Sequence, residues 1–295
     1  MQDVVLRTRG LTKRFGDLVA VDNLDLEVRR GEVLGFLGPN GSGKSTTVGM
    51  ILGLIKPTLG AVELGIPLRR IGAIIESPAF YPFLSGRDNL RALALAVDGV
   101  GEDAIEKLLG VVGLSDAGHR KYQTYSLGMK QRLGIASTLL CDPELVILDE
   151  PTNGLDPAGQ QEIRALIPRL AEEGRSVLLA SHLLHEVEQV CDRVAILRRG
   201  RLLAQGLVSD LTQQQAYLEI GVGDLETARG VLAGLECVRD VRIADGFLHV
   251  DADASDGAQI SKALAEAGIY VSSLSQKHSS LEDVFLDLTS EDEGR

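Results

Sequence analysis

The sequence predicts an α/β protein built on a mostly parallel sheet and followed by a smaller α+β domain. Short apolar runs at 33–37, 71–75, 145–148, 177–180 and 194–197 are bounded by turn residues and separated by helical patterns. Runs this apolar are typical of strands that helices cover on both faces. Beyond about residue 213 the elements change to a β-α-β-β-α-β order. The 295 residues are enough for about two domains.

The first domain, residues 1–212, adds two features to the parallel sheet. The runs at 4–8 and 24–28, the second alternating Leu, Asp, Leu, Glu and Val, predict antiparallel strands with one solvated face. Residues 87–140 hold no convincing strand and many Ala and Leu at helical spacing. We therefore expect a helical subdomain at about 77–140.

The second domain, residues 213–289, is predicted to contain strands at 217–222, 238–243, 247–251 and 269–274 and helices at 225–235 and 258–267. Asp245-Gly246, between two of these strands, is typical of a two-residue hairpin turn. This order of elements is the ferredoxin-like pattern. A last amphipathic segment at 280–288 precedes an acidic tail, 290–295, which we expect to be disordered.

Composition and charge exclude several classes of protein. Lys and Arg number 30 and Asp and Glu 42, so the net charge of −12 opposes a general affinity for nucleic acids or anionic lipids. The sequence begins without a basic and then apolar leader and holds no apolar run of membrane-spanning length, so neither a signal peptide nor a span is expected. Cys141, Cys191 and Cys237 are expected to be reduced, buried thiols of a cytoplasmic protein. Work at a membrane would need a membrane-spanning partner.

A glycine-rich loop directly follows the strand at 33–37 and opens a helical run. It satisfies the pattern G-x-x-x-x-G-K-[ST] and comprises Gly38, Pro39, Asn40, Gly41, Ser42, Gly43, Lys44, Ser45 and Thr46. Glycines let backbone N–H groups converge on phosphate oxygens at a helix N-terminus, while Lys44 would reach the β- and γ-phosphates and Ser45 would hold Mg²⁺. The loop therefore predicts nucleotide binding.

Asp149 and Glu150 follow the apolar strand at 145–148, at the sheet edge where open α/β sheets bind their ligands. Asp149 would hold Mg²⁺, directly or through water. Glu150 would polarise the attacking water as a general base. The two carboxylates predict hydrolysis of the bound nucleotide.

Three further motifs lie at 125–131 (Tyr-Ser-Leu-Gly-Met-Lys-Gln), at 154–157 (Gly-Leu-Asp-Pro) and at Ser181-His182. Together with 38–46 and 145–150 they follow the order of ABC transporter ATPases, which residues 3–212 resemble. The resemblance implies a P-loop NTPase core with an antiparallel β subdomain and a helical subdomain. It also implies Mg²⁺-dependent ATP hydrolysis, a head-to-tail homodimer formed on ATP binding, and an integral-membrane permease that holds the chain at the inner face of the cell membrane. No nucleic-acid partner is expected.

The same resemblance assigns roles to further residues. Ser126, Leu127, Gly128 and Met129 look like the ABC signature, altered here from L-S-G-G-Q, which completes the partner subunit's ATP site. Asp156 resembles the D-loop aspartate that communicates between the two sites, and His182 resembles the switch histidine near the γ-phosphate. Ser126 and Asp156 are also suited to local roles as helix caps.

Phe15 and Glu76 have structural as well as functional interpretations. Phe15 lies where the family stacks an aromatic ring on adenine, but a single Phe is also typical of a core. Glu76 lies at the position of the family's Q-loop glutamine, where its carboxylate would ligate Mg²⁺ or, alternatively, be a solvated surface acid.

Glu76, the dipeptide Ser77-Pro78 and the altered signature resemble the ATPases of bacitracin and lantibiotic resistance exporters. Residues 280–286 resemble the tail of daunorubicin-type drug exporters. We therefore expect a subunit that powers export of a drug, a peptide antibiotic or another amphiphile. The alternative is a soluble ABC-type regulator of ribosomes or DNA repair, against which stand the single cassette and the lack of a basic arm.

Overall fold

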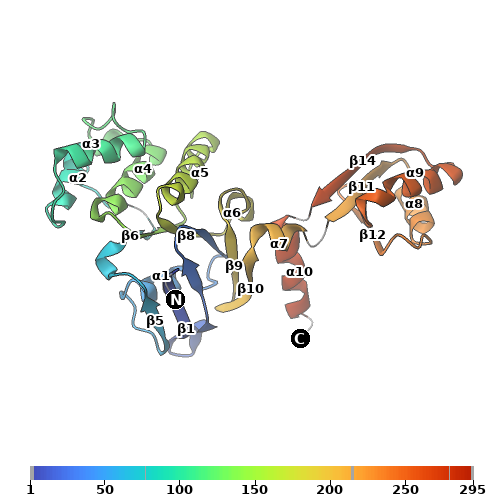
Figure 1. The fold of residues 1–295 in the computed structure, drawn as a ribbon, viewed down its shortest axis with the longest axis horizontal. Coiled ribbons are helices and arrows are strands. Elements are labelled where there is room, and N and C mark those ends of the chain that lie inside the picture. The colour runs from blue at the N-terminus through green and yellow to red at the C-terminus, as the bar shows by residue number, and fades with distance from the viewer. Residues whose placement is uncertain (1–2, 77, 214–215, 279, 294–295) are drawn as a thin grey trace. The chain divides into compact units, whose positions relative to one another are not determined.

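The computed structural model describes residues 3–76, 78–213, 216–278 and 280–293 and divides into two compact units (Figure 1). The first unit is Met1–Leu207 and the second is Val208–Arg295. The division lies five residues before the boundary expected at 212/213, because α7 (Val208–Gln213) belongs to the second unit. Within the described residues, no helix combines the length and apolarity that crossing a bilayer requires.

An antiparallel sheet in the first unit consists of β1 (Val4–Phe15), β2 (Leu18–Leu24), β3 (Glu27–Arg29) and β5 (Leu59–Leu64), with β1 pairing with the other three. The continuous strand expected at 24–28 is wrong, since the chain breaks between β2 and β3. The Thr8 hydroxyl accepts from the Leu26 N–H and donates to the Leu24 carbonyl, both at 2.8 Å. These side-chain bonds satisfy backbone groups that a continuous ladder would otherwise pair.

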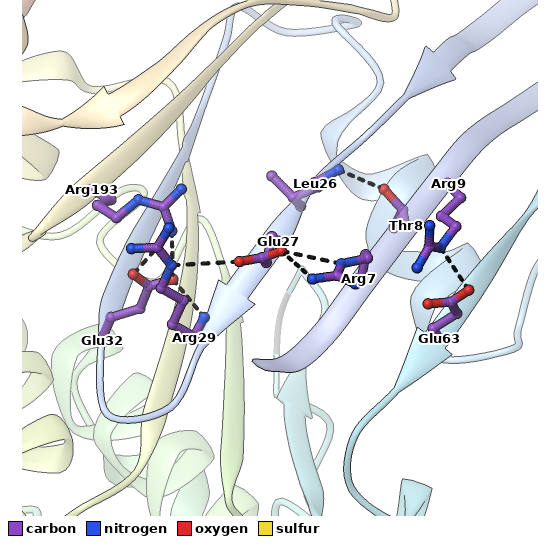
Figure 2. A network of polar contacts seen from close by, with 9 residues as sticks. All are labelled: Arg7, Thr8, Arg9, Leu26, Glu27, Arg29, Glu32, Glu63 and Arg193. Carbon is purple, nitrogen blue, oxygen red and sulfur yellow. Dashed lines mark hydrogen bonds and ion pairs between the residues drawn. The ribbon is translucent and has the colours of Figure 1, made fainter. Parts of the chain in front are cut away.

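A network of charged residues joins this sheet to β9 (Arg193–Arg198) of the parallel sheet (Figure 2). Arg7 donates from Nε and Nη2 to Glu27 at 3.1 and 2.6 Å, and these hydrogen bonds hold the pKa of Glu27 below its usual value. The buried Glu32 accepts from the Arg29 N–H at 2.6 Å and from Arg193 Nη1 at 3.1 Å. Because Glu32 binds groups from both sheets, it fixes one against the other.

The second sheet of this unit has the strand order β10-β9-β4-β8-β7-β6. Its members besides β9 are β10 (Arg201–Leu207), β4 (Val33–Leu37), β8 (Ser176–Ser181), β7 (Leu145–Asp149) and β6 (Ile71–Ile74). All neighbours are parallel except the β9–β10 hairpin, and every residue of β4, β7 and β8 is buried. The prediction of a parallel sheet covered on both faces is therefore confirmed.

Helices pack closely on this sheet. They are α1 (Lys44–Ile51), α5 (Pro157–Glu172) and α6 (Leu184–Val190). A Cβ on Gly35 of β4 would overlap Val187 of α6 and would crowd the sulfur of Cys191. Burial raises the pKa of the Cys191 thiol, as expected of an inert packing residue. The three cysteines are free, although Cys141 and Cys237 are only half-buried.

The segment between β6 and β7 is helical, as its composition predicts. It contains α2 (Gly86–Ala94), α3 (Glu102–Val111), α4 (Leu127–Thr138) and the short helices η2 (Tyr122–Thr124) and η3 (Leu139–Cys141), while η1 (Leu68–Arg70) precedes β6. In the described part of this segment no strand forms beyond one isolated bridge, Ser85 with Lys121.

The strands and longer helices between 216 and 278 follow the order β-α-β-β-α-β. The second unit contains β11 (Ala216–Val222), α8 (Leu225–Leu232), β12 (Asp240–Ala244), β13 (Phe247–Asp251), η4 (Ala254–Asp256), α9 (Gly257–Glu266), β14 (Val271–His278) and α10 (Leu281–Glu293). The sheet order is β12-β13-β11-β14, with all neighbours antiparallel. In the structure α10 extends into the acidic tail as far as Glu293. Residues 294–295 lie outside the described chain.

Candidate functional site

The loop between β4 and α1 has a backbone that only glycine adopts easily. Gly41 and Gly43 have φ angles of 80° and 105°. A Cβ on Gly43 would lie 2.5 Å from the Ala20 carbonyl oxygen, and one on Gly38 would lie 2.5 Å from that of Leu197. Gly43 caps α1 without a side-chain hydrogen bond, so the first amides of the helix are left for an anion.

Lys44 lies buried over this loop. Its ammonium donates to the Gly38 carbonyl at 2.7 Å and lies 3.4 Å from the Pro39 carbonyl and 3.3 Å from Glu150 Oε1. A buried ammonium held by these few acceptors is positioned to exchange them for phosphate oxygens.

Asp149 ends β7 and is only 2% exposed. Among the described residues, no donor reaches either carboxylate oxygen with hydrogen-bond geometry. Burial raises the pKa of Asp149, while the nearby Ser45 hydroxyl and the charge of Lys44 oppose that rise. Two unpaired oxygens beside a hydroxyl are the hard donors that Mg²⁺ prefers, so the residues fit the metal.

Glu150 and His182 are brought together by neighbouring strand ends. Because β7 and β8 are parallel with Asp149 opposite Ala180, the residues that follow each strand emerge side by side. His182 Nδ1 lies 2.7 Å from Glu150 Oε2. Glu150 also has a φ of 50°, which is unusual for a side chain of this size, and its N–H donates to the Ala180 carbonyl at 2.9 Å. The backbone of Glu150 is thus held by a hydrogen bond, and its carboxylate is held by the contact with His182.

Lys44 and Glu150, but not Asp149 or His182, line a pocket of about 480 Å³, a volume suited to a small ligand. The lining residues are Phe15, Leu18, Val19, Ala20, Asn40, Gly41, Gly43, Lys44, Ser45, Thr46, Glu150 and Arg199. Phe15 is 49% exposed, so its interpretation as a core residue is wrong. The Lys13 ammonium lies 4.7 Å from the centre of its ring. An exposed ring at the mouth of a phosphate-binding pocket can stack on a base.

The residues of the altered signature and Asp156 are not among those that line this pocket. Ser126 Oγ accepts from the Met129 N–H at 3.2 Å at the start of α4, and Leu127 is 47% exposed. Asp156 Oδ1 accepts from the Gly159 N–H at 3.0 Å at the start of α5. Both expected cap roles are therefore present, and the exposed signature remains available to another molecule.

Glu76 follows β6 with a φ of 60° and an exposed side chain. Its negative charge is one of the groups that raise the pKa of Asp149, after burial and Glu150. The Glu76 carboxylate is therefore exposed to solvent and close enough to Asp149 to affect its pKa. Ser77, the first residue of the Ser77-Pro78 dipeptide, lies outside the described residues.

Sequence reasoning missed three residues of this region. Thr152 Oγ1 donates to Glu186 Oε2 at 2.5 Å, and both side chains are buried. This bond ties the segment after Glu150 to the helix after His182. The third is Arg199, whose signal in the sequence is only an Arg-Gly pair between two apolar runs.

The chain is similar to known proteins over most of its length. Residues 21–153 match a family model described as ABC transporter. The bacitracin transport ATP-binding protein BcrA of Bacillus licheniformis is 40% identical over 296 residues, covering 96% of this chain and 97% of that protein. The daunorubicin resistance ATP-binding protein DrrA3 of Streptomyces coeruleorubidus is 34% identical over 311 residues, covering 99% of this chain and 98% of that protein. A solved ATP-binding subunit of an ABC transporter is 32% identical with a TM-score of 0.62, covering 70% of this chain and 91% of that one.

Proposed function

The chain belongs to the ATP-binding subunits of ABC transporters, which bind and hydrolyse ATP, and we propose that Glu150 and His182 carry out the hydrolysis step. The observation that carries this proposal is the 2.7 Å contact between His182 Nδ1 and Glu150 Oε2 beside the phosphate loop. Glu150 would accept the proton of the water that attacks the γ-phosphate. With its Nδ1–H donated to Glu150, His182 would accept from that water at Nε2, and a hydrogen bond to the γ-phosphate would require a proton on Nε2 as well.

Nucleotide binding is assigned to the pocket residues. The phosphates would accept from the backbone N–H groups of the loop at 38–43 and from Lys44, Ser45 and Thr46 at the start of α1, and adenine would stack on Phe15. Mg²⁺ would be held by Ser45 and Asp149, with Glu76 at its solvated side. When bound, the metal neutralises charge that develops on the phosphates.

A head-to-tail homodimer is the proposed ATP-bound state. Ser126, Leu127, Gly128 and Met129 would complete the partner subunit's site, and Asp156 would connect the two sites. The exposed start of α4 supports this role, since the positive end of a helix attracts phosphate. Light scattering of the hydrolysis-impaired Glu150→Gln variant should give twice the monomer mass with ATP and the monomer mass with ADP. A monomer at saturating ATP would contradict the dimer.

The transport partner is a membrane permease, as in ABC transporters generally, and the proposed cargo is a drug, a peptide antibiotic or another amphiphile that is exported. The relatives named for bacitracin transport and daunorubicin resistance support this class because their similarity extends over nearly the whole chain. We place the chain at the inner face of the membrane, bound to the permease. The net charge of −12 disfavours the ribosomal or DNA-repair alternative.

Purification of a tagged chain from detergent-solubilised membranes tests this proposal. A membrane-spanning protein should co-purify, and the ATPase activity of the complex should rise when bacitracin or daunorubicin is added. Co-sedimentation with ribosomes, and no membrane-spanning partner, would favour the alternative.

A further inference from the structure

The tip of the β9–β10 hairpin lies beside the phosphate loop. Arg198 pairs with Arg201, so Arg199 and Gly200 form a two-residue turn, with φ angles of 49° and 81°. The Gly200 N–H donates to the Ser42 carbonyl at 2.9 Å, and its carbonyl accepts from the Asp22 N–H at 2.8 Å. The turn is thereby hydrogen-bonded to the phosphate loop itself, which fixes where the Arg199 side chain begins.

Arginine is an unexpected residue at this position of the turn. Two left-handed residues form a type I′ turn, in which Asn, Asp or Gly is favoured at the first place. The hairpin of the second unit follows this rule, with Asp245 at 52° and Gly246 at 81°. Arg199 adopts the same conformation without a short polar side chain that eases it. Turn formation therefore does not account for the arginine, and a role of its side chain is indicated.

The Arg199 side chain is exposed and lines the nucleotide pocket. Of the three charged residues lining it, Lys44 and Glu150 lie 3.3 Å from each other. Arg199 has no hydrogen bond or ion pair with any other residue that the structure describes. An unpaired guanidinium whose side chain starts from a fixed turn at the wall of a phosphate-binding pocket is available to an anion.

We propose that Arg199 binds the phosphate chain of ATP, in addition to Lys44 and the start of α1. A guanidinium can donate two N–H groups to phosphate oxygens at once, a geometry that lysine does not offer. The inference rests on the nucleotide site proposed above and adds to it a residue outside the recognised motifs.

The test uses Arg199→Asn in the full chain, with Arg69→Asn as the matched control. Arg69 is also exposed and unpaired among the described residues, but it does not line the pocket. Calorimetric titration should show ATP binding to Arg199→Asn weakened about tenfold. Its Tm without nucleotide should be equal to or above that of the unsubstituted chain, because Asn suits the turn. Arg69→Asn should leave affinity unchanged.

Three results with these two variants would overturn the inference. They are an unchanged affinity in Arg199→Asn, an equal loss in Arg69→Asn, or a loss of affinity that accompanies a fall in Tm. Titration with 2′-deoxyATP should show the same loss as ATP, and a loss that disappears with this analogue would assign Arg199 to the ribose instead. Lys44→Ala distinguishes a failure of this inference from a failure of the proposed nucleotide site. If Lys44→Ala binds ATP normally, the nucleotide site itself is wrong. If Lys44→Ala weakens binding and Arg199→Asn does not, only the inference about Arg199 is refuted.

Discussion

The phosphate loop of the first unit and the sheet of the second unit differ in how many buried polar atoms lack a hydrogen-bond partner. At the phosphate loop of the first unit, buried oxygens of Ser42, Asp149 and Glu150 have no hydrogen-bond partner among the described residues. On the sheet of the second unit, the one such atom among the described residues is His249 Nε2, which lies 3.9 Å from Glu219, and Glu219 also lies 3.8 Å from Lys277. The other face of that sheet, including Leu218 and Val250, packs in an apolar cluster with residues of α8 and α9.

Buried polar atoms without a hydrogen-bond partner indicate where a ligand binds. A buried oxygen without a partner is costly, so a protein retains it where a bound group will supply the missing interaction. A partly exposed glutamate that lies near a lysine and a histidine carries less of this cost, because solvent reaches the group. The chemistry is therefore expected in the first unit, and paired substitutions in the two units test that expectation.

Lys44→Ala should have the largest effect, because it removes the buried cation over the phosphate loop. ATP affinity should fall at least about a hundredfold, as for a lost charged hydrogen-bonding group. Lys262→Ala is the control in the second unit, where the exposed Lys262 lies 3.7 Å from Glu266. Calorimetric titration of both variants with ATP measures the two affinities. Equal affinities would contradict the assignment of ATP binding to the first unit.

His182→Ala should lower ATP hydrolysis at least about tenfold, which corresponds to about 1.4 kcal/mol of barrier. His249→Ala is the matched control, since each histidine lies near a glutamate but only His182 lies beside the phosphate loop. Steady-state ATPase rates at saturating ATP provide the measurement. Unchanged rates in His182→Ala would return this residue to a structural role.

Substitutions of Glu76 should have smaller effects. Glu76→Gln keeps a side-chain oxygen of the same reach, so we expect measurable ATPase activity to remain. Glu76→Ala removes that oxygen and should impair stimulation by the permease more than ATP binding. ATPase rates of the isolated chain and of the permease complex measure the two effects. If the permease stimulates the ATPase activity of Glu76→Ala as much as that of the unsubstituted chain, Glu76 is only a solvated surface residue.

Removal of the part of the second unit that follows α7 should have the smallest effect on nucleotide binding. A chain that ends at residue 213 should bind ATP with unchanged affinity, since every pocket-lining residue lies in the first unit. Thermal unfolding provides the control that the shortened chain is folded. A folded chain that has lost affinity would show that the second unit takes part in binding.

The sequence was sufficient to predict the features that depend on local patterns. Apolar runs identify β4, β7 and β8, and Asp245-Gly246 identifies the hairpin of the second unit. Parallel pairing of β7 with β8 then explains why Glu150 and His182 meet although they are 32 positions apart.

The features that were missed depend on contacts between distant residues. The break between β2 and β3 comes from the Thr8 hydroxyl, which bonds backbone groups more than 15 positions away. Thr152 and Glu186 are unremarkable in sequence until folding buries them together. Arg199 is identified only when the hairpin tip is placed against Ser42.

The general-base role of Glu150 is the central claim, and single-turnover hydrolysis of radiolabelled ATP by Glu150→Gln tests it most directly. Binding, measured in the same samples, should stay within a factor of about two, because the phosphate loop and Lys44 are intact. Product formation should slow at least about a hundredfold, as expected when a positioned base is removed. Hydrolysis by Glu150→Gln at the rate of the unsubstituted chain would contradict the account.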